Sequence, residues 1–180
     1  MMTKLVLLLS VLTACFFGYR HYMAPLPLES HFLASIPVKV RMLPKPDTAS
    51  HMTGQVSIEQ VVNQQVENGE MTLVVVAMGT AFDVFDEQDI NELSLEDFDS
   101  ISRRFGNDFG INAAISRRGF IQHQGKKGYE LVINLGEEKG EMVQHIYTHD
   151  NHMLLLMASY TADGREKQTA QAFLDSVEFL

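Results

Sequence analysis

Apolar and polar positions alternate along much of the chain, which is typical of strands in a sheet. Residues 36–43 alternate in this way, and the run Pro-Lys-Pro-Asp at 44–47 follows them, so they predict a strand that ends in a turn. Residues 71–78 hold consecutive valines and predict a further strand. Three or four more strands are expected at 111–123, 129–135, 141–149 and 152–160, with turns at 125–128, 136–140 and 150–151. The chain is therefore expected to be rich in β-structure.

Residues 55–67 fit two patterns. Their apolar positions recur at a period of two, yet Ser57 and Gln60 also form a helix capping box before a helical stripe of valines. The pair Asn68-Gly69 favours the strand, because a two-residue hairpin turn needs residues of this kind. We therefore predict a β-hairpin that joins 55–67 to 71–78.

Two helices and a short final strand complete the predicted elements. Ser94 starts a segment with helical apolar spacing that ends at Gly106. Asp163 and Glu166 form a capping box at the start of a second helix, 163–174, and residues 177–180 close the chain as a strand. Because helices do not alternate with strands, we expect the α+β class: a single antiparallel β-sheet of about six to seven strands with two helices packed on one face.

The N-terminus has the pattern of an export signal. Lys4 precedes an eight-residue apolar run, 5–12, and the sequence Leu-Thr-Ala-Cys at 12–15 resembles a bacterial lipobox, with Cys15 as the lipidated residue. An uncleaved membrane anchor is the alternative, although 15 apolar residues fall short of the roughly 20 needed to span a bilayer. A buried structural Cys15 is a third reading. The first two readings both predict an exported, membrane-attached protein, in the bacterial periplasm or at the cell surface.

Composition sets the domain organisation. Of 180 residues, 46% are hydrophobic and 21% are charged, which fits one globular domain. We expect a signal peptide at 1–15, a tether at 16–31 containing Pro25 and Pro27, and an α+β domain at 32–180. Fourteen basic against 23 acidic residues argue against nucleic acid as a partner, and a single Cys excludes an internal disulfide.

The end of the chain resembles the closing segment of small exported bacterial domains with the PsbP-like fold. The resemblance lies in residues 168–179, which contain the run Ala-Phe-Leu-Asp-Ser before an apolar strand. Residues 42–46, 128–131 and 145–156 are similar, in order, to an early strand with a Pro-x-Pro turn, a Gly-Tyr strand entry and a late hairpin. The resemblance implies this fold and an accessory, non-catalytic role in complexes, and it carries over no active-site residue.

Three histidines form the densest group of possible metal ligands. If Asp150 and Asn151 make a two-residue turn, His149 and His152 become a directly paired cross-strand couple that could hold Zn or Cu. His145 would lie roughly 13 Å from His149 along the strand, too far for the same ion. The alternative is that these residues are solvated at a hairpin tip. No other cofactor is expected.

A second candidate is a cluster of acidic residues. It comprises Asp83, Asp86, Glu87, Asp89 and Glu92, and continues to Glu96, Asp97 and Asp99. The spacing lacks the pattern of an EF-hand calcium loop, so it is either a solvated loop and helix start or a surface that attracts a basic partner protein. Arg117 and Arg118 would point to opposite faces of a strand and so cannot both line an anion site.

The sequence contains no Gly-x-Ser-x-Gly nucleophile motif, no His-Glu-x-x-His zinc motif and no phosphate-binding loop motif. We therefore expect a protein that is not an enzyme: a membrane-tethered, exported binding or accessory module that docks on an envelope protein complex. A metal carrier or sensor that uses His149 and His152 is the alternative.

Overall fold

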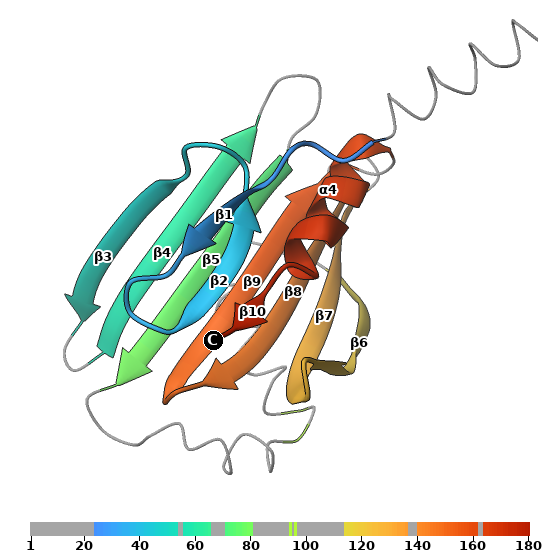
Figure 1. Cartoon of the computed structure of the whole chain (residues 1–180). Coiled ribbons are helices and arrows are strands. Elements are labelled where there is room, and N and C mark those ends of the chain that lie inside the picture. The colour runs from blue at the N-terminus through green and yellow to red at the C-terminus, as the bar shows by residue number, and fades with distance from the viewer. Residues whose placement is uncertain are drawn as a thin grey trace, which may run out of the picture.

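The computed structural model describes residues 24–53, 56–65, 71–80, 94, 96, 114–136, 140–161 and 164–180, which form two antiparallel sheets and a helix (Figure 1). The elements before the acidic segment are β1 (Glu29–Phe32), β2 (Val38–Met42), β3 (Asp47–Thr53), β4 (Val56–Gln65) and β5 (Met71–Thr80). Those after it are β6 (Ala114–His123), β7 (Lys126–Gly136), β8 (Gly140–His149), β9 (His152–Tyr160), α4 (Arg165–Leu174) and β10 (Glu178–Phe179).

The larger sheet has seven antiparallel strands in the order β3-β4-β5-β9-β8-β7-β6. The predicted antiparallel pairing of 55–67 with 71–78 is confirmed, because β4 and β5 pair from Val56 opposite Thr80 to Gln65 opposite Met71. The predicted turn at Asn68-Gly69 lies outside the described residues. The predicted turn at Asp150 and Asn151 is confirmed too, and both residues have the positive φ of a type I′ turn. The antiparallel sheet of about seven strands is therefore what the alternation indicated.

The prediction of one single sheet is wrong, since β1, β2 and β10 form a separate three-stranded sheet. Residues 36–43 contain a strand, but β2 lies across the larger sheet and buries Val38, Val40 and Met42. β10 pairs with it, Phe179 opposite Val38. A period of two identifies a strand and its buried side but not the sheet to which the strand belongs.

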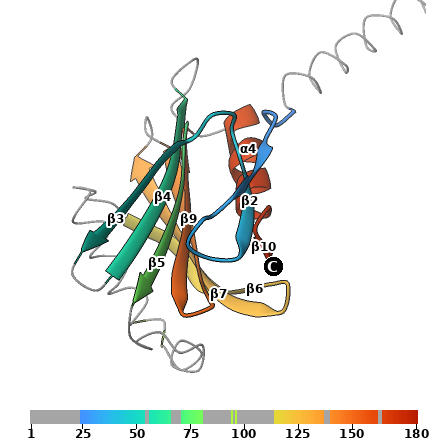
Figure 2. The same cartoon turned by 60° about the vertical axis from the view of Figure 1, so that its left-hand side comes forward.

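Figure 2 shows that the small sheet and α4 lie on the same side of the larger sheet, as a second layer. The predicted helix 163–174 is present as α4, although it begins at Arg165 after Gly164 and has no side-chain cap. The other predicted helix, 94–106, lies outside the described residues apart from Ser94 and Glu96. β1 begins within the predicted tether, and β3 occupies a segment in which no strand was expected.

The layer of β2, β10 and α4 covers what we call the inner face of the larger sheet. Inner-face residues such as Leu73, Val75, Leu154 and Leu156 belong to one buried cluster with β2, Phe173, Leu174 and Val177. The opposite, outer face carries a second buried apolar cluster, which includes Tyr129, Leu131, Ile146 and Leu155. The central strands are therefore apolar on both faces, which explains why the valine run of β5 does not alternate.

The closing motif Phe-Leu-Asp-Ser has a structural explanation. Phe173 and Leu174 are buried on α4, and Asp175 ends the helix with its N–H donating to the carbonyl of Gln171 (2.9 Å). The hydroxyl of Ser176 accepts a hydrogen bond from the backbone N–H of Arg41 on β2 (2.8 Å). The motif therefore anchors the end of the chain to both the core and the small sheet.

A buried carboxylate fixes the loop between β1 and β2 on the sheet. Glu59 is buried on β4, and its two oxygens accept hydrogen bonds from the backbone N–H groups of Ala34 (2.9 Å) and Ser35 (2.7 Å) and from the Ser35 hydroxyl (2.6 Å). Burial by itself raises the pKa of this carboxyl, but the three hydrogen bonds outweigh it and hold the pKa below the ordinary value. The ionised form is thus the one that the loop stabilises.

We expect Glu59→Ala to lower the free energy of unfolding by about 3 kcal/mol, because it leaves two backbone donors of the loop without their acceptor. Glu59→Gln keeps one acceptor oxygen and is expected to cost less. The lowered pKa also predicts that the wild type loses this contribution as the pH falls below about 4.5, through the folded-state pKa. Urea unfolding at pH 7 and pH 4 measures both effects, and an unchanged midpoint in Glu59→Ala would refute the anchoring role.

Candidate functional site

The predicted histidine pair lies at the tip of the hairpin between β8 and β9. His149 stands directly opposite His152, as the register predicted. The two rings contact different neighbours, however: His149 packs edge-on against Phe179 at 5.1 Å between ring centroids, whereas His152 fills the space beside Gly79, where a Cβ would collide with it. The Nδ1–H of His152 donates to the carbonyl of Asp150 (2.6 Å).

A metal site at this tip gains no third ligand from the structure. Within the ranges described above, no group of three or more His, Cys, Asp or Glu residues is placed to hold one ion. Two imidazoles alone fall short of the three or four protein ligands of a structural or catalytic zinc site. Binding of Zn or Cu by His149 and His152 stays a prediction.

A row of charged and polar side chains crosses β6, β7 and β8 on the inner face. His145 is 6% exposed, and its Nε2 lies 3.2 Å from Oε2 of Glu130, directly opposite in the register. The other Glu130 oxygen accepts an ion-paired hydrogen bond from Arg117 at 2.9 Å. Arg117 and Arg118 pair with successive residues of β7, so they point to opposite faces, as predicted.

The electrostatics of this row favour a neutral imidazole. Burial lowers the pKa of His145, and the hydrogen bond to Glu130 offsets this only in part. The Nδ1 atom of His145 is buried without a hydrogen-bond partner. Burial also raises the pKa of the neighbouring Tyr147 to about 12. His145 is thus a neutral buried side chain near pH 7, and a proton placed on it is unfavourable.

Aromatic contacts join this row to the end of the chain. Tyr147 packs edge-on against Phe179 at 5.5 Å and against His145 at 6.2 Å, and its ring fills the space beside Gly128. His123 contacts the same Tyr147 ring, and its Nε2–H donates to the carbonyl of Val177 (2.8 Å). The cluster therefore holds β10 against the sheet, and its observed role is structural.

Other residues predicted to be functional lie outside the described residues. They are Cys15, the proposed lipidation site, and the acidic residues Asp83, Asp86, Glu87, Asp89 and Glu92. Lipidation and an acidic docking surface stay predictions. Among the described residues no helix is long and apolar enough to cross a membrane.

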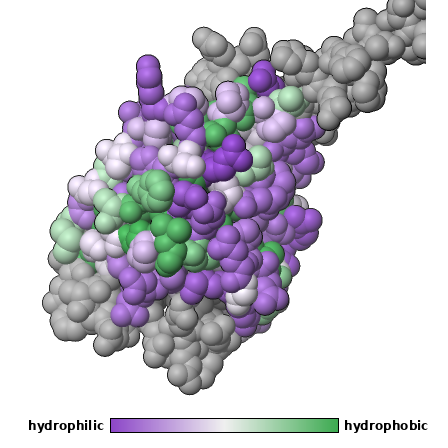
Figure 3. All heavy atoms as spheres, in the orientation of Figure 1, coloured by the Kyte–Doolittle hydropathy of each residue, from purple (hydrophilic) through white to green (hydrophobic). Residues whose placement is uncertain are grey.

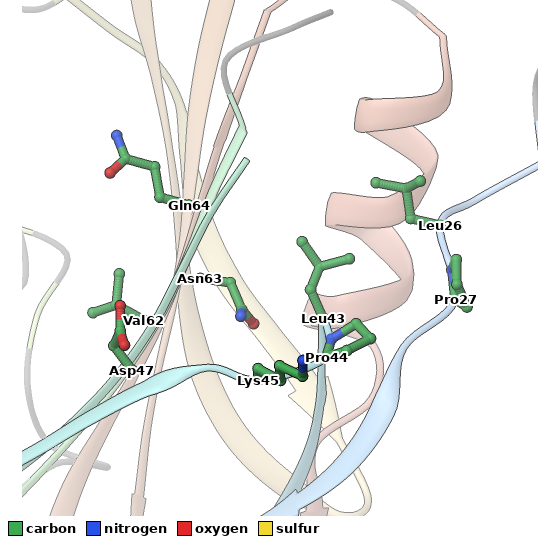
Figure 4. A pocket seen from close by; sticks show the side chains of 9 residues that line it. All are labelled: Leu26, Pro27, Leu43, Pro44, Lys45, Asp47, Val62, Asn63 and Gln64. Atoms are coloured by element: carbon green, nitrogen blue, oxygen red, sulfur yellow. The ribbon is translucent and has the colours of Figure 1, made fainter. Parts of the chain in front are cut away.

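A partly open cavity of about 550 Å³ lies at the end of β4 and is a candidate binding site in the described part of the chain (Figure 4). Three segments of the chain line it: the residues before β1, the connection from β2 to the start of β3, and residues near the end of β4. The lining residues are Leu26, Pro27, Leu43, Pro44, Lys45, Asp47, Val62, Asn63 and Gln64.

The cavity exists because β3 is shorter than the strand beside it. β3 and β4 pair only as far as Asp47 opposite Val62, whereas β4 continues along β5 to Gln65. Before Asp47 the chain turns away through residues 44–46, where Lys45 has a φ of 56° and the flanking prolines have no N–H to donate. This leaves a gap at the sheet edge, which we call the β4 notch: the cavity beside Val62, Asn63 and Gln64.

The β4 notch reaches both faces of the sheet. Val62, Asn63 and Gln64 are consecutive strand residues, so their side chains alternate between the faces. Figure 4 shows the Asn63 side chain directed toward Leu43, with Gln64 on the other side of the strand. A cavity lined by all three residues therefore wraps around the backbone edge of β4.

Asn63 is the unusual residue of the notch. It is 7% exposed, and its Oδ1 atom is buried without a hydrogen-bond partner. A buried polar atom left unsatisfied costs about 1–3 kcal/mol, so a donor that entered the notch would recover that loss. Sequence reasoning missed this site, and the only signals were an Asn that directly follows two valines in β4 and the Pro-x-Pro turn.

The buried His145 predicts an acid-sensitive stability. Because its pKa is lowered in the folded state, the unfolded chain binds the proton more readily, and stability falls as the pH drops below about 6.5. His145→Gln removes this titration and is expected to flatten the dependence of the melting temperature on pH between 7.5 and 5.5. The exposed His51 on β3 supplies a control, His51→Gln. Equal slopes for wild type and His145→Gln would contradict the assignment.

Comparison with known proteins gives a match by structure only. No protein-family profile and no curated protein sequence matches the chain. The solution structure of cyanobacterial PsbP (CyanoP) from Synechocystis sp. PCC 6803 is similar, with a TM-score of 0.54 and 13% sequence identity over 85% of this chain and 92% of that one. A Pseudomonas aeruginosa protein of unknown function, PA94, described as a putative regulator, matches with a TM-score of 0.35 and 11% identity over 74% of this chain and 83% of that one.

The match to cyanobacterial PsbP covers nearly all of that protein and most of this chain. At 13% identity it shows a shared fold and no more. The described part of the chain therefore has the PsbP-like fold that the closing segment and the late hairpin implied.

Proposed function

We propose that the protein is an exported, membrane-attached accessory module, without catalysis of its own, that docks on an envelope protein complex. The observation that carries the proposal is the PsbP-like fold, which spans the chain from near its N-terminal pattern to its last strand. The accessory role was implied by the resemblance to that family. The short apolar run at 5–12 and the lipobox-like Cys15 support attachment to a membrane.

Exposed apolar side chains support a docking role. Figure 3 shows an apolar patch over the β1 region, within a surface that is largely polar. Phe32 at the end of β1 is 63% exposed, and Met52 on the edge strand β3 is 64% exposed. Contiguous apolar patches are uncommon on monomeric proteins and often mark interfaces, in which large apolar side chains serve as anchors.

The mass of the mature N-terminus tests attachment. We expect the full chain, expressed in a diderm bacterium, to be recovered from membranes with its first residue at Cys15 and with the added mass of a diacyl or triacyl modification. Cys15→Ala is expected to lose both the modification and the membrane fraction. Recovery from the cytosol with Met1 intact and an unmodified thiol would contradict export and lipidation together.

Mild-detergent purification tests docking. We expect the wild-type chain to be recovered from membranes with a defined set of envelope proteins at constant stoichiometry. Phe32→Ser should reduce their recovery at least about tenfold, since an aromatic anchor of an interface is worth 2 kcal/mol or more. Phe120→Ser is the matched control, because Phe120 is an exposed aromatic side chain on β6, an edge strand of the larger sheet and not a strand of the small sheet. No stable partner with the wild type, or equal loss in both variants, would count against docking through β1.

A further inference from the structure

We propose that the β4 notch binds an extended peptide segment of a partner protein, which pairs with the end of β4 as an added strand in line with β3. This inference rests on the proposed docking function and names the site and the kind of segment that it would receive. The proposal does not depend on the predicted pair His149 and His152 or on the predicted acidic cluster.

The free edge of β4 is the first argument. Over Asn63 and Gln64 the strand pairs with β5 on one side only, while on the other side β3 has already ended at Asp47. A strand edge presents backbone N–H and C=O groups in an extended row, and extended peptides recognise such edges by main-chain hydrogen bonds. The notch is the place that two or three further residues of β3 would occupy.

The shape of the cavity is the second argument. Its volume of about 550 Å³ lies within the range of sites that bind ligands. Because it wraps around the edge of β4 and reaches both faces, it suits an extended chain whose side chains alternate between the faces. A compact ligand would contact only one of these two sides.

The chemistry of the walls is the third argument. On the inner-face side, Leu26 and Leu43 form an apolar wall. The Oδ1 atom of Asn63, which has no partner, could accept a hydrogen bond from one N–H or O–H group there. On the other side, Asp47 and Gln64 supply polar groups. This combination fits a segment with Thr opposite Asn63, apolar β-branched residues two positions to either side on the same face, and polar residues between them.

The test uses a defined probe, the end-blocked peptide Val-Ser-Thr-Ser-Val carrying fluorescein on a flexible linker. We expect saturable binding to the full chain in mild detergent, measured by fluorescence anisotropy, with a Kd tighter than about 1 mM. The same peptide with the backbone nitrogens of all five residues N-methylated cannot donate hydrogen bonds from those residues to β4, so its binding should be at least about tenfold weaker. Free valine and acetate serve as competitors that share parts of the chemistry but not the strand.

Asn63→Leu separates binding from folding, because the two readouts should move in opposite directions. Removing an unsatisfied buried acceptor should raise the melting temperature by about 2–4 °C. The same change should weaken peptide binding at least about tenfold. Gln122→Leu makes the same kind of substitution at the exposed opposite edge of the sheet, on β6, and should leave peptide affinity unchanged.

Several results would overturn the proposal. They are the absence of saturable binding by the blocked peptide, equal binding of the N-methylated peptide, full competition by free valine or acetate, and unchanged affinity in Asn63→Leu. Failure of these tests with intact co-purification of envelope proteins would remove the notch and leave docking in place. Peptide binding at the notch without any envelope partner would instead remove the envelope role.

Discussion

The burial of the inner face of the seven-stranded sheet is the constraint on which the rest of this structure depends. Both ends of the folded chain supply the cover, since β2 comes from the start and α4 with β10 from the end. Hydrogen bonds between residues far apart in sequence join them: the N–H of Leu26 donates to Thr169, and that of Arg41 to Ser176. The cover forms only when segments from both ends of the chain pack against the sheet. The core of this domain is therefore completed by contacts between residues far apart in the sequence.

The polar groups beneath that cover differ in how completely they are satisfied. Glu59 accepts three hydrogen bonds from the loop that it anchors, and Glu130 contacts both His145 and Arg117. Asn63 lies on the same face, and its carbonyl oxygen has no partner. Buried polar atoms are nearly always paired in folded proteins, and Nδ1 of His145 is another exception. Unlike His145, Asn63 lines the notch, where a donor from a partner could reach it.

Local patterns in the sequence predicted local structure well. The hairpin over 55–78 and the turn at Asp150 and Asn151 follow from residue preferences within a few positions, and the closing segment indicated the fold. The second sheet was missed because alternation in 36–43 reveals a strand without revealing its neighbours. β3 was missed because its residues are exposed, so no apolar side marks it.

The candidate site was harder to predict than the fold. The register that pairs His149 with His152 was foreseeable, but the direction of each ring depends on Phe179 and Gly79, which lie far away in the sequence. Asn63 becomes unusual only through the absence of a partner for its Oδ1, and a sequence does not show absent contacts. The proposed binding site therefore depends on what the packing leaves open and not on a recognisable motif.

The cover layer and the notch have a common origin. After β2 has crossed the inner face, the chain must pass from the cover to the edge of the larger sheet, and it does so through residues 44–46. The two prolines and the positive φ of Lys45 make this passage possible, but they also prevent pairing with the last residues of β4. The same path of the chain, from β2 over the inner face to β3 at the edge, thus leaves the end of β4 without a neighbouring strand on its β3 side. An added strand there would complete the sheet without disturbing the cover.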